Sequence, residues 1–224
     1  TVMSKLKEKK CVLIGKTTLD ELAMGGTGTT GHKGITYNPY TPKHTHMMGG
    51  SSCGSAAATA LGIAPFALGS DTGDSVRKPA SFGGLVGVKP TWGRISRYGL
   101  FPFAPSLDHV GYFTRCVDDA AIVLEALSGR DYMDATSSEK PVESYADGLN
   151  ASIKGKKIAI IKEITDSISD PAVLKAFNAS ILALKNEGAE IEYVEFGAKE
   201  LEAIYASYMF ISCAEATSNG ANFY

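Results

Sequence analysis

Residues 49–80, GGSSCGSAAATALGIAPFALGSDTGDSVRKPA, combine small side chains, hydroxyls and charges more densely than a connecting turn requires. Residues 51–62 begin with Ser/Thr-type capping and continue into alanines, which predicts a helix that packs closely against its neighbours. Residues 64–70 are short and apolar, which is typical of a buried strand. That strand runs into DTGD, directly before Ser75 and Arg77. The stretch therefore raises the hypothesis of a serine-centred site.

A serine nucleophile needs a base, donors for an oxyanion and space for a substrate carbonyl. The small residues before Ser75 let backbone N–H groups converge into an anion-binding nest. Ser51 and Ser52 add two hydroxyls on a flexible backbone, so a relay between serines could replace a histidine. From the residues alone, a glycine-rich structural turn explains the stretch equally well.

Three other motifs have plain structural interpretations. GKTT at 15–18 lacks the glycine that a phosphate-binding loop needs five residues earlier, where Lys10 stands, so a turn at a strand end is favoured. HTH at 44–46 has no third metal ligand at a sensible spacing, which favours a solvated loop. GSSCG at 50–54 matches the Gly-x-Ser-x-Gly elbow of α/β-hydrolases, but no good strand precedes it and only His109 follows it.

The rest of the chain alternates between helical and strand patterns. Apolar runs predict strands at residues 11–15, 156–163 and 189–196. Capping residues and apolar 3/4 spacing predict helices at residues 17–24, 116–129, 170–188 and 201–219. Residues 25–54 form a long glycine-rich loop, and loops of this length are usually functional. The alternation predicts an α/β fold with a mainly parallel or mixed sheet.

The composition is that of a soluble globular protein. The chain has 224 residues, a formal net charge of −2, 44% hydrophobic residues and 21% charged residues. This balance argues against a broad nucleic-acid or membrane surface, and no apolar run reaches the roughly 18 residues of a membrane span. The four cysteines are far apart and form no CxxC pair, which predicts free thiols in a reducing compartment, the cytoplasm.

Residues 49–80 closely resemble the signature of the amidase signature family. Further agreement lies in VLIGKTTLDELAMG, VGVKPTWGRISRYGL, SLDHVGYFTR and YMFISCAEATSN, which look like the corresponding parts of A subunits of glutamyl-tRNA(Gln) amidotransferases. The resemblance implies the amidase-signature fold, a mixed β-sheet core flanked by helices. It covers residues 1–224 as a partial domain that we expect to be cut at both ends.

The resemblance also implies the roles of individual residues. Ser75 is the expected nucleophile, and Ser51 is the expected bridging serine, which follows a cis peptide bond and hydrogen-bonds to Ser75. The expected oxyanion hole is formed by the backbone N–H groups of Thr72, Gly73, Asp74 and Ser75. The expected supporting residues around these groups are Ser52, Asp71 and Arg77, the last in a buried bracing role. Met24 is a candidate for the substrate pocket, with a plain packing role as the alternative, and no metal site is implied.

The chain departs from the family pattern at three places. Cys53 stands where glycine is usual, and Asp74 stands where many members have glycine. Asp tolerates the left-handed backbone region better than most residues, so we expect the turn to survive. The family's catalytic lysine belongs to a motif upstream of VLIGKT that does not occur here, and Lys16 lies in a different motif. We therefore expect the central piece of a larger enzyme, inactive when residues 1–224 stand alone.

The implied activity is that of a glutamine amidase subunit with a Ser-Ser-Lys mechanism. Its ammonia would convert Glu-tRNA(Gln) to Gln-tRNA(Gln) on a partner. The implied partners are two further subunits, of the B and C types, which form a heterotrimer with this one. The resemblance implies no membrane partner. The implied subunit has no cofactor of its own, because ATP, Mg²⁺ and most of the charged tRNA are bound by the partner. Two alternatives stay open: a free-standing amidase acting on another small amide, and a non-catalytic scaffold.

Overall fold

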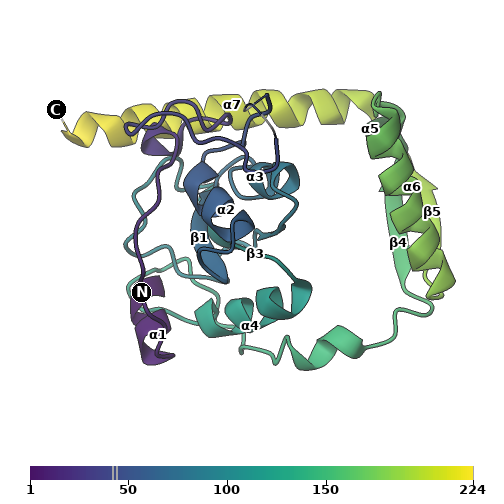
Figure 1. Ribbon diagram of the computed structural model, residues 1–224, viewed down its shortest axis with the longest axis horizontal. Helices are drawn as coiled ribbons and strands as arrows, with labels where there is room; N and C mark the ends of the chain where they lie inside the picture. Colours follow the sequence, from purple (N-terminus) through teal and green to yellow (C-terminus); the bar gives the residue numbers. More distant parts are fainter. Residues whose placement is uncertain (42, 44, 224) are drawn as a thin grey trace. The chain divides into compact units, whose positions relative to one another are not determined.

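The computed structural model describes residues 1–41, 43 and 45–223, with Phe223 described by its backbone only. The chain forms two compact units, which are described separately. Unit 1 comprises Thr1–Leu149 together with Ile211–Tyr224, and unit 2 comprises Asn150–Phe210. The ribbon in Figure 1 follows the chain from α1 to the long helix α7.

Unit 1 is built on a three-stranded antiparallel sheet. Its strands are β1 (Phe66–Asp71), β2 (Val86–Val88) and β3 (His109–Thr114), in the order β1-β3-β2. The register pairs Phe66 with Thr114 and Asp71 with His109, so β1 ends where β3 begins. This pairing brings the end of β1, which carries the predicted site, next to the segment that leads into β3.

The central strand β3 feeds a separate core on each face of the sheet. Successive side chains of a strand point to opposite faces. Tyr112 and Val110 accordingly pack with residues of α1 (Val2–Glu8) and α4 (Val117–Leu127), while Phe113 packs with residues of α2 (Cys53–Ala60) and α3 (Arg77–Phe82). Helices therefore cover both faces of this sheet (Figure 1).

Helix α2 follows the expected pattern but begins differently from expectation. Its small residues allow close packing, and Ala56 is fully buried. Ser52 occupies the N-cap position, yet its hydroxyl makes no capping hydrogen bond because it binds the backbone of Ser70 instead. Helix α4 ends as predicted, close to Gly129, whose φ of 112° suits a residue without a Cβ.

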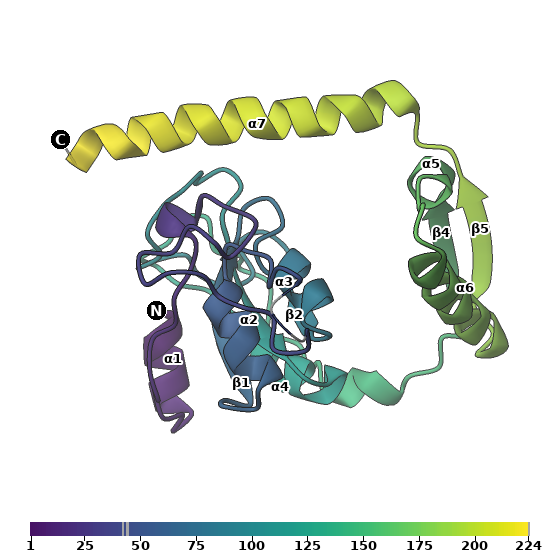
Figure 2. The same ribbon diagram turned by 45° about the horizontal axis from the view of Figure 1, so that its top comes forward.

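Unit 2 is a β-α-β arrangement. Strands β4 (Lys157–Ile161) and β5 (Glu190–Val194) pair in parallel, and α6 (Pro171–Asn186) connects them after the short helix α5 (Lys162–Asp166). Asp170 caps α6 by accepting hydrogen bonds from the N–H groups of Ala172 and Val173, at 2.7 and 3.3 Å. Helix α7 (Ala198–Gly220) is the long helix that follows β5 (Figure 2). Its residues up to Phe210 belong to unit 2 and those from Ile211 to unit 1.

The structure corrects three sequence expectations. Residues 11–15 form no strand: Val12, Leu13 and Ile14 are 83, 63 and 65% exposed, and no backbone hydrogen bond joins them to another described residue. Residues 17–24 contain only the short 3₁₀ turn η1 (Glu21–Ala23) instead of a helix. The end of the strand predicted at 156–163 is helical in α5. A strand requires a hydrogen-bonding partner as well as an apolar pattern. The N–H of Cys11 bonds back to the carbonyl of Leu6, and the backbone of residues 12–15 has no partner within the described chain.

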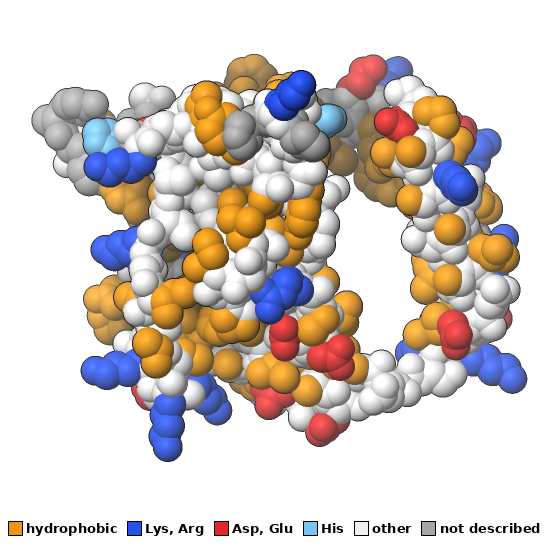
Figure 3. Space-filling model, viewed as in Figure 1, with side chains coloured by type: hydrophobic (Ala, Val, Ile, Leu, Met, Phe, Trp, Pro, Cys, Tyr) orange, Lys and Arg blue, Asp and Glu red, His pale blue; other side chains and the backbone are white. Residues whose placement is uncertain are grey.

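Lys and Arg side chains gather over α1, while apolar and charged side chains elsewhere on the visible face are interspersed (Figure 3). Within the described residues, we find no helix with the length and apolar character needed to cross a bilayer. Cys53 is buried, and the thiols of Cys11, Cys116 and Cys213 are exposed and unpaired.

Candidate active site

Ser75 lies on a short loop between β1 and α3. It is 6% exposed, and the next residue, Val76, is fully buried in the core beneath α2 and α3. The Ser75 carbonyl accepts a hydrogen bond from the N–H of Ser52 at 3.2 Å, which joins this loop to the start of α2. The backbone N–H groups of Gly73, Asp74 and Ser75 make no hydrogen bond with any described residue. Three neighbouring donors therefore remain available beside the Ser75 hydroxyl.

Asp71 fixes the C-terminal side of the loop. Its carboxylate is fully buried at the end of β1 and accepts hydrogen bonds from the N–H groups of Val76 and Arg77, at 2.9 and 3.2 Å. It also accepts from the Arg77 side chain, through Nη2 at 2.9 Å and Nε at 3.2 Å. A buried carboxylate with four such bonds is well compensated for its loss of water.

Arg77 braces the loop, but from a more exposed position than expected. Its Nη2 also donates to the carbonyl of Gly73, which closes the loop across its base. The hydrogen bonds to Asp71 raise the pKa of Arg77, and burial opposes them only in part. The predicted burial is wrong, because the Arg77 side chain is 49% exposed while Asp71 is fully buried. The Arg77 side chain therefore lies at the surface, and its guanidinium group binds the buried Asp71 carboxylate while about half of the side chain stays in contact with solvent.

We expect Arg77→Ala to lower stability modestly. The change removes hydrogen bonds to a buried carboxylate that keeps its two backbone donors, so the cost is about 1–3 kcal/mol. In a chain of this size that corresponds to a fall of several degrees in melting temperature. Calorimetry would measure it, with Lys78→Ala as the control, since the exposed Lys78–Asp74 pair contributes little. Equal melting temperatures for Arg77→Ala and wild type would refute the bracing role.

Asp74 fits the loop without backbone strain. Neither Gly73 nor Asp74 has a positive φ, so the left-handed conformation that we considered for Asp74 is not used. The Asp74 carboxylate lies 2.7 Å from the ammonium of Lys78, one helical turn further along. Its negative charge is thus engaged with Lys78, which reduces its repulsion of an oxyanion.

The hydroxyls of the adjacent residues Ser51 and Ser52 differ in their hydrogen bonds. The Gly50–Ser51 peptide bond is cis, which confirms the expectation. The Ser52 hydroxyl binds both the carbonyl and the N–H of Ser70, each at 3.2 Å, and so ties the start of α2 to β1. The Ser51 hydroxyl is buried and has no hydrogen-bond partner among the described residues.

The expected hydrogen bond between Ser51 and Ser75 is therefore not formed. The backbone of Ser51 is held, because its carbonyl accepts from the N–H of Asp20 at 3.0 Å. Its hydroxyl has no described base to orient it from the other side, so nothing directs it toward Ser75. A buried hydroxyl without a hydrogen bond lowers the stability of the fold, so the Ser51 hydroxyl is free to bind a group that is not among the described residues.

The buried residue Asp20 lies next to Gly50 and Ser51. Its buried carboxylate accepts from the N–H groups of Thr27, Gly28 and Thr30, at 3.2, 3.0 and 3.0 Å, and from the Thr30 hydroxyl at 2.8 Å. Burial opposes ionisation of Asp20, but the bonds from Gly28, Thr30 and Thr27 outweigh it and lower its pKa. A Cβ on Gly50 would lie 2.0 Å from Oδ2 of Asp20, so only glycine fits at this point.

A small pocket of about 240 Å³ adjoins the predicted site through Ser70. It is otherwise apolar, lined by Leu19, Leu22, Ala23, Leu100 and Phe101. Met24 follows the turn that supplies two of these residues, but it does not line the pocket itself and is 43% exposed.

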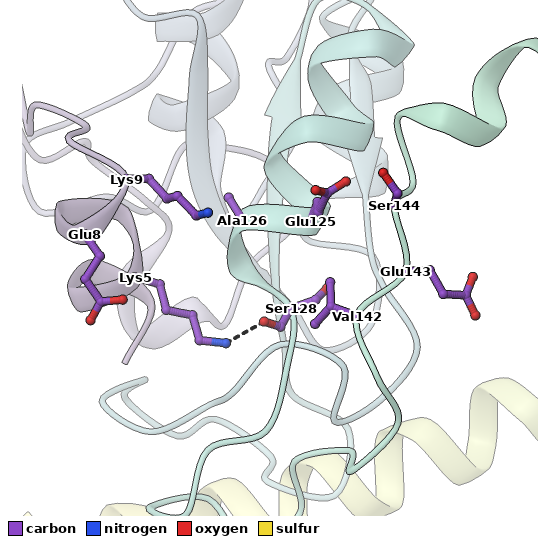
Figure 4. A pocket seen from close by; sticks show the side chains of 9 residues that line it. All are labelled: Lys5, Glu8, Lys9, Glu125, Ala126, Ser128, Val142, Glu143 and Ser144. Atoms are coloured by element: carbon purple, nitrogen blue, oxygen red, sulfur yellow. Dashed lines mark hydrogen bonds between the residues drawn. The ribbon is translucent and has the colours of Figure 1, made fainter.

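A larger pocket of about 440 Å³ lies elsewhere in unit 1, between α1, the end of α4 and residues 142–144 (Figure 4). Lys5 reaches across it to the carbonyls of Leu127, Ser128 and Gly129, at 3.2, 2.6 and 3.4 Å. Burial lowers the pKa of Lys5. None of the predicted site residues lines this pocket, and the Lys5 side chain is the group that joins α1 to the end of α4.

The motifs GKTT, HTH and GSSCG form neither a phosphate loop, nor a metal site, nor a hydrolase elbow within the described residues. No helix follows GKTT directly, as a phosphate loop would need. His44 lies outside the described residues, and those that are described contain no cluster of three or more potential metal ligands. The hydrolase elbow is not formed: the Ser52 hydroxyl binds Ser70, and the ring of His109 binds the carbonyl of Leu107 at 2.7 Å through Nδ1 and lies 3.4 Å from Lys89 through Nε2.

Comparison with known proteins identifies the family. A family model described as Amidase matches residues 1–224. The chain is 46% identical over 218 residues to the A subunit of the glutamyl-tRNA(Gln) amidotransferase of Akkermansia muciniphila, covering 97% of this chain and 46% of the relative. The protein of the same name from Koribacter versatilis is 46% identical over 223 residues, covering 100% of this chain and 46% of the relative. The chain belongs to the amidase family, and it spans about half the length of these relatives.

Solved structures agree with this assignment. The crystal structure of the glutamyl-tRNA(Gln) amidotransferase A subunit from Thermotoga maritima matches with a TM-score of 0.92 and 42% identity, covering 99% of this chain and 48% of that one. The peptide amidase from Stenotrophomonas maltophilia matches with a TM-score of 0.77 and 35% identity, covering 87% of this chain and 41% of that one. The expected amidase-signature fold and the resemblance to the A subunits are confirmed.

Proposed function

We propose that this chain supplies the nucleophile, the bridging serine and the oxyanion donors of an enzyme that releases ammonia from glutamine. The observation that carries the proposal is the set of unpaired N–H groups at Gly73, Asp74 and Ser75, on a loop whose C-terminal side is fixed by Asp71. Preorganised backbone donors stabilise the negative charge that develops when a carbonyl is attacked. The residues proposed as nucleophile and oxyanion donors lie on one loop, between β1 and α3, and Ser51, proposed as the bridging serine, lies outside it, just before α2.

In the proposed reaction, the Ser75 hydroxyl attacks the side-chain amide carbon of glutamine. Its proton passes to Ser51, and the carbonyl oxygen becomes an oxyanion held by the N–H groups of residues 72–75. Return of the proton to the amide nitrogen releases ammonia and leaves a glutamyl ester on Ser75, which water then hydrolyses. The buried, unpartnered hydroxyl of Ser51 suits a relay that needs a base beyond the described residues, for which the family resemblance implies a lysine.

The proposed setting is a cytoplasmic amidotransferase with two further subunits, of the B and C types. In this assembly the ammonia passes to a partner that binds ATP, Mg²⁺ and most of the charged tRNA, and Glu-tRNA(Gln) becomes Gln-tRNA(Gln). The chain itself uses no cofactor in this scheme. Support comes from the relatives that are named as A subunits of glutamyl-tRNA(Gln) amidotransferases, at 46% identity.

A second candidate is a free-standing amidase that acts on another small amide. The likeness to the peptide amidase of Stenotrophomonas maltophilia favours it, at 35% identity. The small apolar pocket beside Ser70 is compatible with either substrate class. The higher identity to the amidotransferase subunits is the reason for preferring the first candidate.

The test is an ammonia-release assay on the native enzyme, purified with the subunits that accompany it. We expect glutamine to be hydrolysed, with ammonia released when glutamine is the only substrate. When ATP and Glu-tRNA(Gln) are added, glutamate should form faster and the ammonia should appear in Gln-tRNA(Gln), because the partner then consumes it. Asparagine and a peptide amide serve as comparison substrates. Release from the peptide amide at a rate indifferent to ATP and tRNA would favour the free-standing amidase, and release from no amide at all would favour the scaffold.

A further inference from the structure

A second buried carboxylate, Asp108, contacts the other side of the nucleophile loop. Asp108 is 3% exposed and immediately precedes β3. Its Oδ1 accepts a hydrogen bond from the Thr72 hydroxyl at 2.6 Å. Because Asp71 pairs with His109 across the sheet, the two acids lie close to each other at the same end of the sheet. Asp71 holds the residues after Ser75, and Asp108 holds the residue at which the loop begins.

The remaining bonds of Asp108 fix the carboxylate to a neighbouring loop. Oδ2 accepts from the N–H of Phe103 at 3.0 Å, and Oδ1 accepts from the N–H of Ala104 at 3.1 Å. The backbone closes the same turn, since the N–H of Asp108 donates to the carbonyl of Ala104 at 2.8 Å. The orientation of Asp108 is therefore set by residues 103–108, and the Thr72 hydroxyl follows it.

The C-terminal part of α7, which belongs to unit 1, supports this loop from outside. Glu215 accepts a hydrogen bond from the N–H of Ser106 at 2.9 Å. Asn219 donates through Nδ2 to the carbonyl of Phe103 at 3.1 Å. A continuous set of hydrogen bonds thus runs from α7, through residues 103–106 and Asp108, to Thr72.

We propose that Asp108 is a positioning residue, which sets Thr72 and with it the N–H groups that face the oxyanion. The inference rests on the proposed function, since it assigns Asp108 to that reaction. Oxyanion stabilisation depends on donors that are placed in advance, so a loop free to move at Thr72 loses transition-state stabilisation more than substrate affinity. The effect should appear in kcat and leave KM for glutamine nearly unchanged.

Thr72→Val in the native enzyme isolates the contact. Valine keeps the shape of threonine but cannot donate to Asp108, whereas Asp108→Ala also removes the acceptor of two backbone N–H groups and is at risk of unfolding. We expect Thr72→Val to lower kcat roughly 10- to 100-fold with KM within about twofold, and to lower the melting temperature by only a few degrees, as the loss of one hydrogen bond to a buried carboxylate should. Thr72→Ser restores the hydroxyl, and we expect it to recover most of the activity.

Asp108→Asn completes the test. It weakens the bonds to Thr72, Phe103 and Ala104 without leaving a cavity, and combining it with Thr72→Val should cost little more than Thr72→Val alone, because both changes break one link. A Thr72→Val enzyme with wild-type kcat, or a double variant whose losses add in full, would overturn the assignment. Ammonia release that survives Ser75→Ala would instead overturn the proposed function, so the two failures are distinguishable.

Discussion

We expect Ser75→Ala to lower ammonia release from the native enzyme by about 10³-fold or more, because the proposed covalent step then has no nucleophile. The fold is expected to survive, since the bond between the Ser75 carbonyl and the N–H of Ser52 belongs to the backbone. The measurement is ammonia production from glutamine, together with mass spectrometry of acid-quenched enzyme. A glutamyl adduct should appear on the peptide containing Ser75 in wild type and be absent from the variant.

Two companion variants sharpen this result. Ser51→Ala should retain a small activity, because it removes proton transfer, which contributes roughly 10²–10⁴-fold, and leaves the nucleophile in place. Ser81→Ala is the matched control, since Ser81 is an exposed serine of α3 and should behave as wild type. If Ser75→Ala were as active as Ser81→Ala, Ser75 could not be the nucleophile.

The largest effect on stability is expected for Asp20→Ala. The change leaves three backbone N–H groups and the Thr30 hydroxyl without their acceptor, in a region packed against the Ser51 backbone. Unsatisfied buried donors cost about 1–3 kcal/mol each, partly relieved by water, so a total near 3–5 kcal/mol is expected. For a chain of this length, that corresponds to a fall in melting temperature of about 10 °C.

The effect of Asp20 should depend on pH in a defined direction. The folded-state pKa of Asp20 lies below its ordinary value, so its ionised form stabilises the fold above pH 4 and this contribution fades as the pH falls through the lower folded-state pKa. The stability gap between wild type and Asp20→Asn should therefore be widest near neutral pH and narrow below pH 4, as measured by urea unfolding. Asp166→Asn, at an exposed site on α5, is the control for replacing a surface carboxylate with an amide. A gap that stays constant from neutral to acid pH would contradict the role given to the ionised carboxylate.

Local patterns predicted the elements whose partners are close in sequence. The alanine-rich helix α2, the helix α4 and the β4-α6-β5 unit all form where capping and periodicity placed them. Strand β3 was not predicted, because its residues follow a segment interrupted by glycine and proline and become a strand only between β1 and β2. The apolar residues 11–15 show the reverse case, a strand pattern without a partner.

Some residues of the candidate site could be predicted from the sequence and others could not. The residues around Ser51 and Ser75 share one continuous signature, so Ser51 before a helix and Ser75 after a strand could be anticipated. The contributions of Asp20 and Asp108 could not, because each carboxylate accepts its bonds from residues that only the fold assembles. Asp20 lies within the helix predicted at residues 17–24, and in the structure its carboxylate instead accepts hydrogen bonds from the N–H groups of Thr27, Gly28 and Thr30.

The burial of Cys53 can be followed by chemical modification of its thiol. Its sulfur is buried against Gly28, where an added Cβ would lie 2.9 Å from the Cys53 Cβ, and burial raises the pKa of the thiol. Thiolates are the form that alkylating reagents attack, so Cys53 should resist modification while Cys11, Cys116 and Cys213 react. Slow alkylation of Cys53 would therefore measure how well its thiol stays covered by the segment around Gly28.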